Sequence, residues 1–104
     1  MDMRLKKMIS NKPLYFTEHA RFKMRQYGLS EARVKRVLHA PVRVEAGIVP
    51  KTVAVMQRAG AKRPQELWVM YEDTKKARKI IAAWRYPGVS PVREPPPFPA
   101  DILE

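Results

Sequence analysis

Two adjacent side chains near the end of a β-like segment combine a cation with an aromatic ring, and both types act on phosphate-containing groups. The guanidinium of Arg85 would neutralise charge on a phosphate, and Tyr86 would stack on a base or transfer a proton. An ordinary strand end with an exposed arginine and a half-buried tyrosine explains the same pair without chemistry. Both interpretations of Arg85 and Tyr86 therefore stay open.

Two further cations, Lys51 and Arg58, flank a segment of alternating hydrophobic residues that predicts a strand. Because side chains alternate along a strand, we expect these cations to share one face of the sheet with Arg85. Together they would form a phosphate clamp. The alternative is a solvated strand edge whose charges help to prevent aggregation.

Acid–base and metal chemistry have few candidate residues in this chain. Histidine titrates near neutrality, but His19 lies in the first turn of a predicted helix and His39 at a helix end, where structural roles are expected. The absence of cysteine excludes disulfides and thiolate catalysis, and a zinc site would have to rely on carboxylates. We therefore expect no metal and no other cofactor. The lack of an evident strong general base argues against an enzyme.

Two helices are predicted from capping signals at the start of the domain. Thr17 and Ser30 are suitable N-caps, and each is followed by a glutamate that complements the helix dipole. Gly28 ends the first helix, and Pro41 ends the second because proline disfavours helical backbone at the residue before it. The two helices are expected over about residues 18–27 and 31–39.

The hydrophobic period changes from 3.6 to 2 after Pro41, which predicts β-structure. The connections are short, and this favours an antiparallel meander because parallel strands need longer crossovers. In the last strand we expect Ile80, Ala82 and Trp84 to face away from Arg85. Both sheet faces are substantially apolar, so we expect helices on one and a partner, tail or ligand on the other. The four expected strands span about residues 42–46, 52–58, 66–72 and 78–86.

Length and charge describe one small, strongly basic α+β domain. The chain has 104 residues, enough for a single core, and a net charge of +11. Residues 1–86 carry 20 Lys and Arg against seven Asp and Glu, whereas residues 87–104 carry one Arg against three acids. The positive charge therefore belongs to the domain at 1–86. Such a charge attracts phosphates, and RNA, free or in the ribosome, is the expected partner.

Six of the ten prolines lie in residues 87–104, which predicts an extended Pro-rich tail. This tail is either solvated or folds back over the basic sheet through residues such as Phe98, Asp101 and Glu104. A homodimer formed through the sheet or the tail is a further alternative. No segment approaches the ~20 apolar residues of a membrane span, and the start lacks a secretory signal, so we expect a cytoplasmic protein without a membrane partner.

One segment resembles a known family. The residues FTEHARFKMRQYGLS, from Phe16 to Ser30, precede Val34, Val37-Leu38 and Ala40-Pro41. They are similar to the opening of a small uncharacterised prokaryotic family that has a Thr-x-His-Ala helix and a Gly-Ile/Leu-Ser junction. That family is grouped with the RelE/ParE and BrnT-like toxins. The likeness covers about residues 15–86, and it departs at Lys23 and Tyr27, where the family often has arginine.

The resemblance implies a RelE/ParE-like α+β fold with two N-terminal helices on a four-stranded antiparallel sheet and a Pro-rich C-terminal tail. RelE-like ribonucleases act on messenger RNA without a metal, through basic residues on the sheet and a residue near its last strand. Catalytic roles would then fall to Arg85, Tyr86 and Arg58. The RNA-binding residues would be Lys51, Arg58, Arg21, Arg25 and Arg85, of which the two on the first helix also fit a merely solvated surface.

Three functions remain as hypotheses from the sequence. The first is an RNA-binding, toxin-like protein of a toxin–antitoxin pair, in which Arg85 and Arg58 would assist attack of a 2′-hydroxyl on the adjacent phosphate. Its partner would be an acidic antitoxin-like protein. The second is a non-catalytic module that binds nucleic acid or another protein. The third is a gyrase-directed, ParE-like toxin, which would leave RNA intact.

Overall fold

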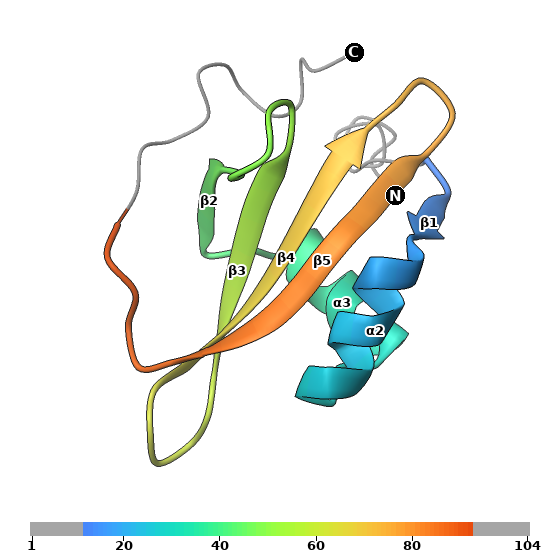
Figure 1. The fold of residues 1–104 in the computed structure, drawn as a ribbon. Coiled ribbons are helices and arrows are strands. Elements are labelled where there is room, and N and C mark those ends of the chain that lie inside the picture. The colour runs from blue at the N-terminus through green and yellow to red at the C-terminus, as the bar shows by residue number, and fades with distance from the viewer. Residues whose placement is uncertain (1–11, 93–104) are drawn as a thin grey trace, which may run out of the picture.

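The chain passes through a short strand and two helices before it builds most of its sheet, as Figure 1 shows. The computed structural model describes residues 12–92. Neither helix of this part of the chain is long and apolar enough to cross a membrane. The elements are β1 (Leu14–Phe16), α2 (Glu18–Tyr27), α3 (Glu31–His39), β2 (Arg43–Ala46), β3 (Val53–Ala59), β4 (Gln65–Asp73) and β5 (Arg78–Pro87).

Both helices begin and end where the capping signals predict. The hydroxyl of Thr17 accepts a hydrogen bond from the amide of Ala20 at 3.0 Å, and that of Ser30 accepts one from the amide of Arg33 at 3.1 Å. Gly28 adopts a φ of 66°, the left-handed conformation that ends α2 and that glycine adopts without strain. The two predicted helices are confirmed.

Thr17 also joins the first helix to the sheet. Its hydroxyl donates to the carbonyl of Ile80 at 3.1 Å, and its backbone N–H donates to the same oxygen at 3.2 Å. A single residue therefore caps α2 and holds the β1–α2 junction against β5.

The sheet is mixed, with the strand order β1-β5-β4-β3-β2 within the described residues. The four predicted strands form antiparallel neighbours, each within one residue of the expected limits. The prediction of a purely antiparallel, four-stranded sheet was wrong, because β1 adds a fifth strand parallel to β5, with Phe16 opposite Ile80. Three residues are too few to show a period of two, and the partner strand lies at the far end of the domain. The RelE-like fold itself stays a prediction.

A bulge in β5 changes which side chains share a face. Tyr71 lies opposite Ile80, whereas the residue before Tyr71 lies opposite Ala82, so Ile81 is an extra residue without a partner on β4. Ile80 consequently belongs to the core under the helices, while Trp84 packs on the other face. The expectation that Ile80 and Trp84 face the same way was therefore wrong.

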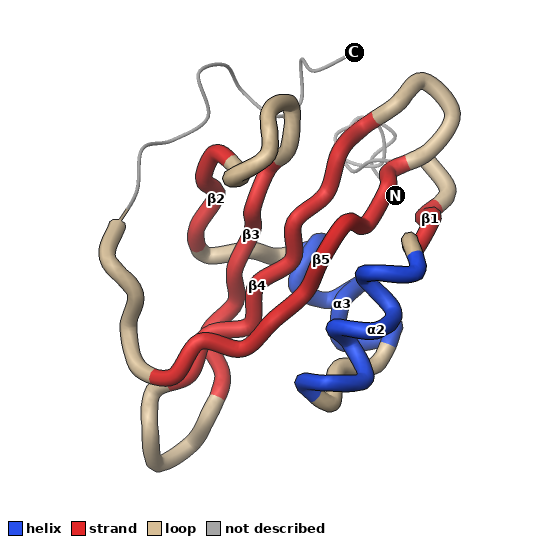
Figure 2. Tube along the Cα trace, in the orientation of Figure 1, coloured by secondary structure: helices blue, strands red, loops and turns tan. Residues whose placement is uncertain are grey.

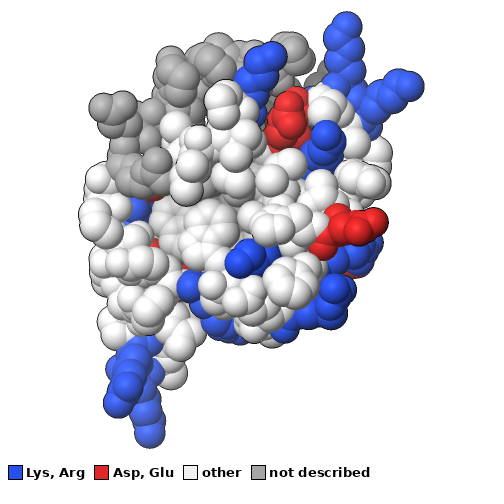
Figure 3. All heavy atoms as spheres, in the orientation of Figure 1, with Lys and Arg blue, Asp and Glu red and all other residues white. Residues whose placement is uncertain are grey.

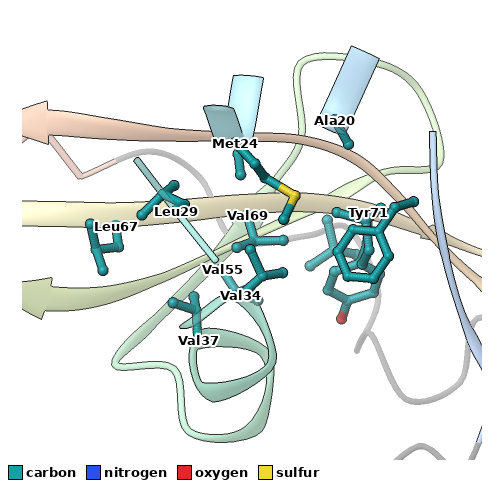
Figure 4. Packing of buried hydrophobic residues seen from close by; sticks show 13 residues of the cluster. Ala20, Met24, Leu29, Val34, Val37, Val55, Leu67, Val69 and Tyr71 are labelled. Atoms are coloured by element: carbon teal, nitrogen blue, oxygen red, sulfur yellow. The ribbon is translucent and has the colours of Figure 1, made fainter. Parts of the chain in front are cut away.

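The main core fills the space between the two helices and one face of the sheet, as Figure 4 shows. Hydrophobic side chains from α2 and α3 pack on alternate residues of the strands, which is the period expected for a sheet buried on one side. This core includes Ala20, Met24, Val34, Val37, Val55, Leu67, Val69 and Tyr71. The intervening strand residues point to the opposite face of the sheet. We call this the open face; its central residues are Ala54, Met56, Trp68 and Trp84.

A short segment that follows β5, residues 88–92, turns back on the β2 side of the sheet (Figure 2), and we call it the strap. The amide of Gly88 donates to the carbonyl of Pro64 at 2.8 Å, and the amide of Ser90 donates to the Glu66 carboxylate at 3.1 Å. The strap is the first part of the predicted Pro-rich tail. The suggested folding back of Asp101 and Glu104 concerns residues outside the described part of the chain.

We predict that Thr17→Ala lowers the free energy of unfolding more than Ser30→Ala does. Loss of an N-cap costs about 0.5–2 kcal/mol, and Thr17 loses in addition its hydrogen bond to β5, worth roughly 0.5–1.5 kcal/mol. Urea unfolding of both variants and the wild type measures this. Equal losses would show that the bond from Thr17 to Ile80 adds no stability.

Candidate functional site

Arg85, one of the predicted catalytic residues, lies on the helix side of the sheet. It is opposite Leu67, a residue of the main core. Its Nε donates to the carbonyl of Tyr27 at 2.8 Å, and its Nη1 lies 3.3 Å from Oε1 of Gln65. The guanidinium therefore joins the end of α2 to the sheet.

Arg58 and Tyr86, the other two predicted catalytic residues, lie on the open face. Each is directly opposite Glu66, one from β3 and the other from β5, and residues opposite one another share a face. The side chain of Arg58 is 58% exposed, and Tyr86 is exposed. The expectation that Arg58 and Arg85 share a face was wrong, because their partners on β4 are consecutive residues and point to opposite sides.

The remaining predicted RNA-binding residues are dispersed. Lys51 is exposed in the turn before β3, at the opposite end of that strand from Arg58, and has a φ of 68°. Arg21 and Arg25 are exposed on α2, in the layer behind the sheet. Arg21 also pairs with Glu31 at 3.0 Å. No single surface collects all the predicted cations.

The histidines lie outside the open face. His19 is exposed on α2 and His39 at the end of α3. Across residues 12–92, no group of three or more His, Asp or Glu side chains is placed to hold a metal ion.

The open face contains a fully buried carboxylate that the sequence analysis did not identify as a candidate. Glu66 is 0% exposed, and it accepts hydrogen bonds from the indole of Trp68 at 2.9 Å and from the hydroxyl of Ser90 at 2.6 Å. The sequence signal for this carboxylate was its position: Glu66 is two residues before Trp68, so the two side chains share one face of β4. A carboxylate on such a hydrophobic face requires cations or hydrogen-bond donors from elsewhere in the chain.

Two arginines supply the positive charge. Nη1 of Arg43 lies 3.3 Å from Oε2 of Glu66, and Nη1 of Arg58 lies 3.7 Å from the same oxygen. Arg43 also donates from Nε to Oε2 of the buried Glu45 at 3.0 Å. Two carboxylates and two guanidiniums therefore form a charge-balanced cluster, which we call the Glu66 cluster.

The hydrogen bonds of the Glu66 cluster keep its central carboxylate ionised. Burial alone would raise the pKa of Glu66. Hydrogen bonds from Ser90 and Trp68, together with the charge of Arg43, outweigh burial and hold this pKa below its ordinary value of 4.5. At neutral pH the strap is therefore attached to a negatively charged acceptor.

A pocket of about 310 Å³ lies beside the Glu66 cluster. This volume is at the lower end of the ~300–1,000 Å³ found for small-molecule sites. The rings of Trp68 and Trp84 are parallel within 4°, with centroids 5.8 Å apart, so the two indoles stack on one another. The walls are mainly hydrophobic and aromatic, and include Trp68, Met70, Trp84, Tyr86, Ser90 and Pro91.

Basic side chains border this face rather than cover it. In Figure 3 the middle of the side turned to the viewer is mostly uncharged, and Lys and Arg lie over the β3–β4 and β4–β5 loops and also at the lower right, where Figure 1 shows α2. The first loop carries the exposed Lys62 and Arg63, and the second carries the exposed Lys75 and Lys76. The arrangement suits a ligand with a flat, uncharged part and negative charges outside the pocket.

Comparisons with protein-family profiles, with curated proteins and with solved structures find no match to this chain. The likeness to RelE/ParE and BrnT-like toxins therefore stays a prediction. The function has to be inferred from the chain's own side chains and their arrangement.

We predict that Glu66→Gln lowers the free energy of unfolding at neutral pH by about 1.5–3 kcal/mol, because the buried donors of Trp68, Ser90 and Arg43 lose a charged acceptor. Since folding lowers the pKa of Glu66, its contribution is complete above about 4.5 and is lost as the pH falls through the lowered value. Urea unfolding of wild type and variant across this range measures the difference. It should shrink in acid, and a constant difference would contradict a role for the Glu66 charge.

Proposed function

We propose that this protein binds RNA through the open face of its sheet, with the phosphates held by the surrounding Lys and Arg side chains. The observation that carries the proposal is the combination of an aromatic, charge-balanced centre with exposed cations on the loops at both ends of the same face. Single-stranded nucleic acids are bound in this manner, with bases on aromatic side chains and the backbone along basic groups.

The charges are available for a polyanion. Lys51, Lys62 and Arg63 are exposed, and within the described residues none of them pairs with an acid. A net charge of +11 adds a long-range attraction that does not depend on sequence. Release of counterions from the phosphates would supply much of the binding free energy, so the affinity should fall steeply as salt rises.

The geometry supports binding better than cleavage. Both hydrogen bonds of Arg85 go to residues of its own chain, Tyr27 and Gln65. Arg58 and Tyr86 share a face, but the third member of the predicted catalytic group does not join them. Cleavage of messenger RNA, a role as a toxin with an acidic antitoxin, and action on gyrase all stay predictions from the sequence.

The first test replaces three exposed loop cations, two from the β3–β4 loop and one from the β2–β3 loop, which also carries the pocket residue Ile48. We expect Lys51→Ala, Lys62→Ala and Arg63→Ala together to weaken binding to single-stranded RNA. They should also reduce the slope of log affinity against log salt by about 2, since each phosphate contact on a single strand contributes about 0.7. Fluorescence anisotropy with an end-labelled oligonucleotide over a salt series measures both quantities.

A matched control removes equal charge from the helix layer. Arg25, Lys35 and Arg36 are exposed on α2 and α3, and their combined alanine variant should retain most of the slope. If the two triple variants lose the same slope, net charge alone accounts for binding and the open face is not the site. If the wild type binds no RNA even at low salt, the proposed function is wrong.

A second test asks whether Arg85 contributes to stability and not to RNA binding. We expect Arg85→Ala to lower the free energy of unfolding by about 1.5–3 kcal/mol, because a charged donor to the end of α2 is lost. RNA affinity should change less than twofold, a difference below about 0.4 kcal/mol. Urea unfolding and the anisotropy titration measure these effects. RNA cleavage by wild type that disappears in a folded Arg85→Ala variant would instead support the ribonuclease prediction.

A further inference from the structure

The pocket occupies the centre of the open face, between its two basic ends. Trp68 and Trp84 lie opposite one another on neighbouring strands, and their rings stack. Trp68 is 4% exposed, and Tyr86, at 36%, is more accessible. A ligand that follows the strands from one basic loop to the other would cross this pocket.

The charges beside the pocket favour a neutral occupant. Glu45 contributes to the lining, and the guanidinium of Arg43 is hydrogen-bonded to its carboxylate. Arg43 also covers the ring of Trp68 at 5.1 Å from the ring centre. Because this pair is balanced, a phosphate or an ammonium group placed in the pocket would lose hydration without a new counter-charge. A flat, uncharged ring would instead gain contact with the aromatic walls.

The strap completes the pocket. Ser90 and Pro91 form part of its wall. Ser90 is held by Glu66, and the carbonyl of Pro91 accepts a hydrogen bond from Nη2 of Arg43 at 3.0 Å. The pocket is therefore bounded by strands on one side and by a segment fixed through the Glu66 cluster on the other.

We propose that this pocket receives a single unpaired base of the RNA strand, so that the protein selects single-stranded over double-stranded RNA. The inference rests on the proposed function. It adds recognition of a base, because the basic loops would contact phosphates, which single-stranded and double-stranded RNA share. A base in a duplex is already stacked and paired, and cannot enter the pocket without leaving the helix. The phosphates on either side of the inserted base would lie toward the exposed cations.

Tryptophan fluorescence tests this directly, because the chain has two tryptophans and both line the pocket. The wild-type protein is titrated with an adenine-rich RNA strand, with an abasic strand of the same length, and with the adenine-rich strand annealed to its complement. We expect the single strand to quench the fluorescence. The abasic strand and the duplex should bind at low salt, as measured by anisotropy, with little change in fluorescence.

Two tyrosines on the open face provide a variant and its control. Tyr86 lines the pocket, whereas Tyr15 on β1 is 57% exposed and lies outside the lining. Tyr86→Ala should weaken binding of the adenine-rich strand by roughly 5- to 150-fold, the range for stacking of one base on one aromatic ring. Tyr15→Ala should leave the affinity within about twofold. Urea unfolding establishes that both variants are folded.

The outcomes separate this inference from the function on which it rests. Salt-dependent binding of all three nucleic acids with equal affinity and no change in fluorescence would overturn the base pocket and leave RNA binding intact. Equal effects of Tyr86→Ala and Tyr15→Ala would overturn it as well. If none of the three ligands binds at low salt, the proposed function fails, and the pocket inference fails with it.

Discussion

A carboxylate without water must be surrounded by cations and hydrogen-bond donors, and Glu66 imposes this requirement on the whole open face. Its partners come from four separate parts of the chain: Arg43 on β2, Arg58 on β3, Trp68 on β4 and Ser90 on the strap. Arg43, Trp68 and Ser90 are held by hydrogen bonds to this group, and Arg58 adds its charge from the surface. One buried charge thereby connects strands from the β2 edge to the centre of the sheet with the segment that follows the last strand.

The position of the pocket follows from this cluster. The strap could lie on the hydrophobic surface in many registers, but the hydrogen bonds from Ser90 to Glu66 select one of them. The indole of Trp68 is oriented by its own bond to Glu66, which sets the plane that lies parallel to Trp84. Stability and recognition therefore depend on the same side chains. Variants in the cluster will affect both, whereas Tyr86 and the loop cations lie outside it.

Strand alternation explains why the predicted functional residues are divided between the two faces of the sheet. Arg85 follows a bulge in β5 and lies opposite a core residue, so its guanidinium turns toward the end of α2. Tyr86, one residue later, turns toward the open face. Two cations on the helix side join elements: Arg85 binds the carbonyl of Tyr27, and Arg21 pairs with Glu31. The loops of the open face keep their charges exposed to solvent.

Local sequence signals were sufficient to predict the helices and the longer strands. A cap at Thr17 or Ser30 and a hydrophobic period of two each depend on only a few neighbouring residues. The helices, the four longer strands and the hydrophobic second face could all be predicted in this way. The parallel strand β1, the bulge at Ile81 and the ring of partners around Glu66 could not. Each depends on pairing between residues far apart in the chain, and that pairing is decided only when the core packs and a buried charge finds its counter-ions.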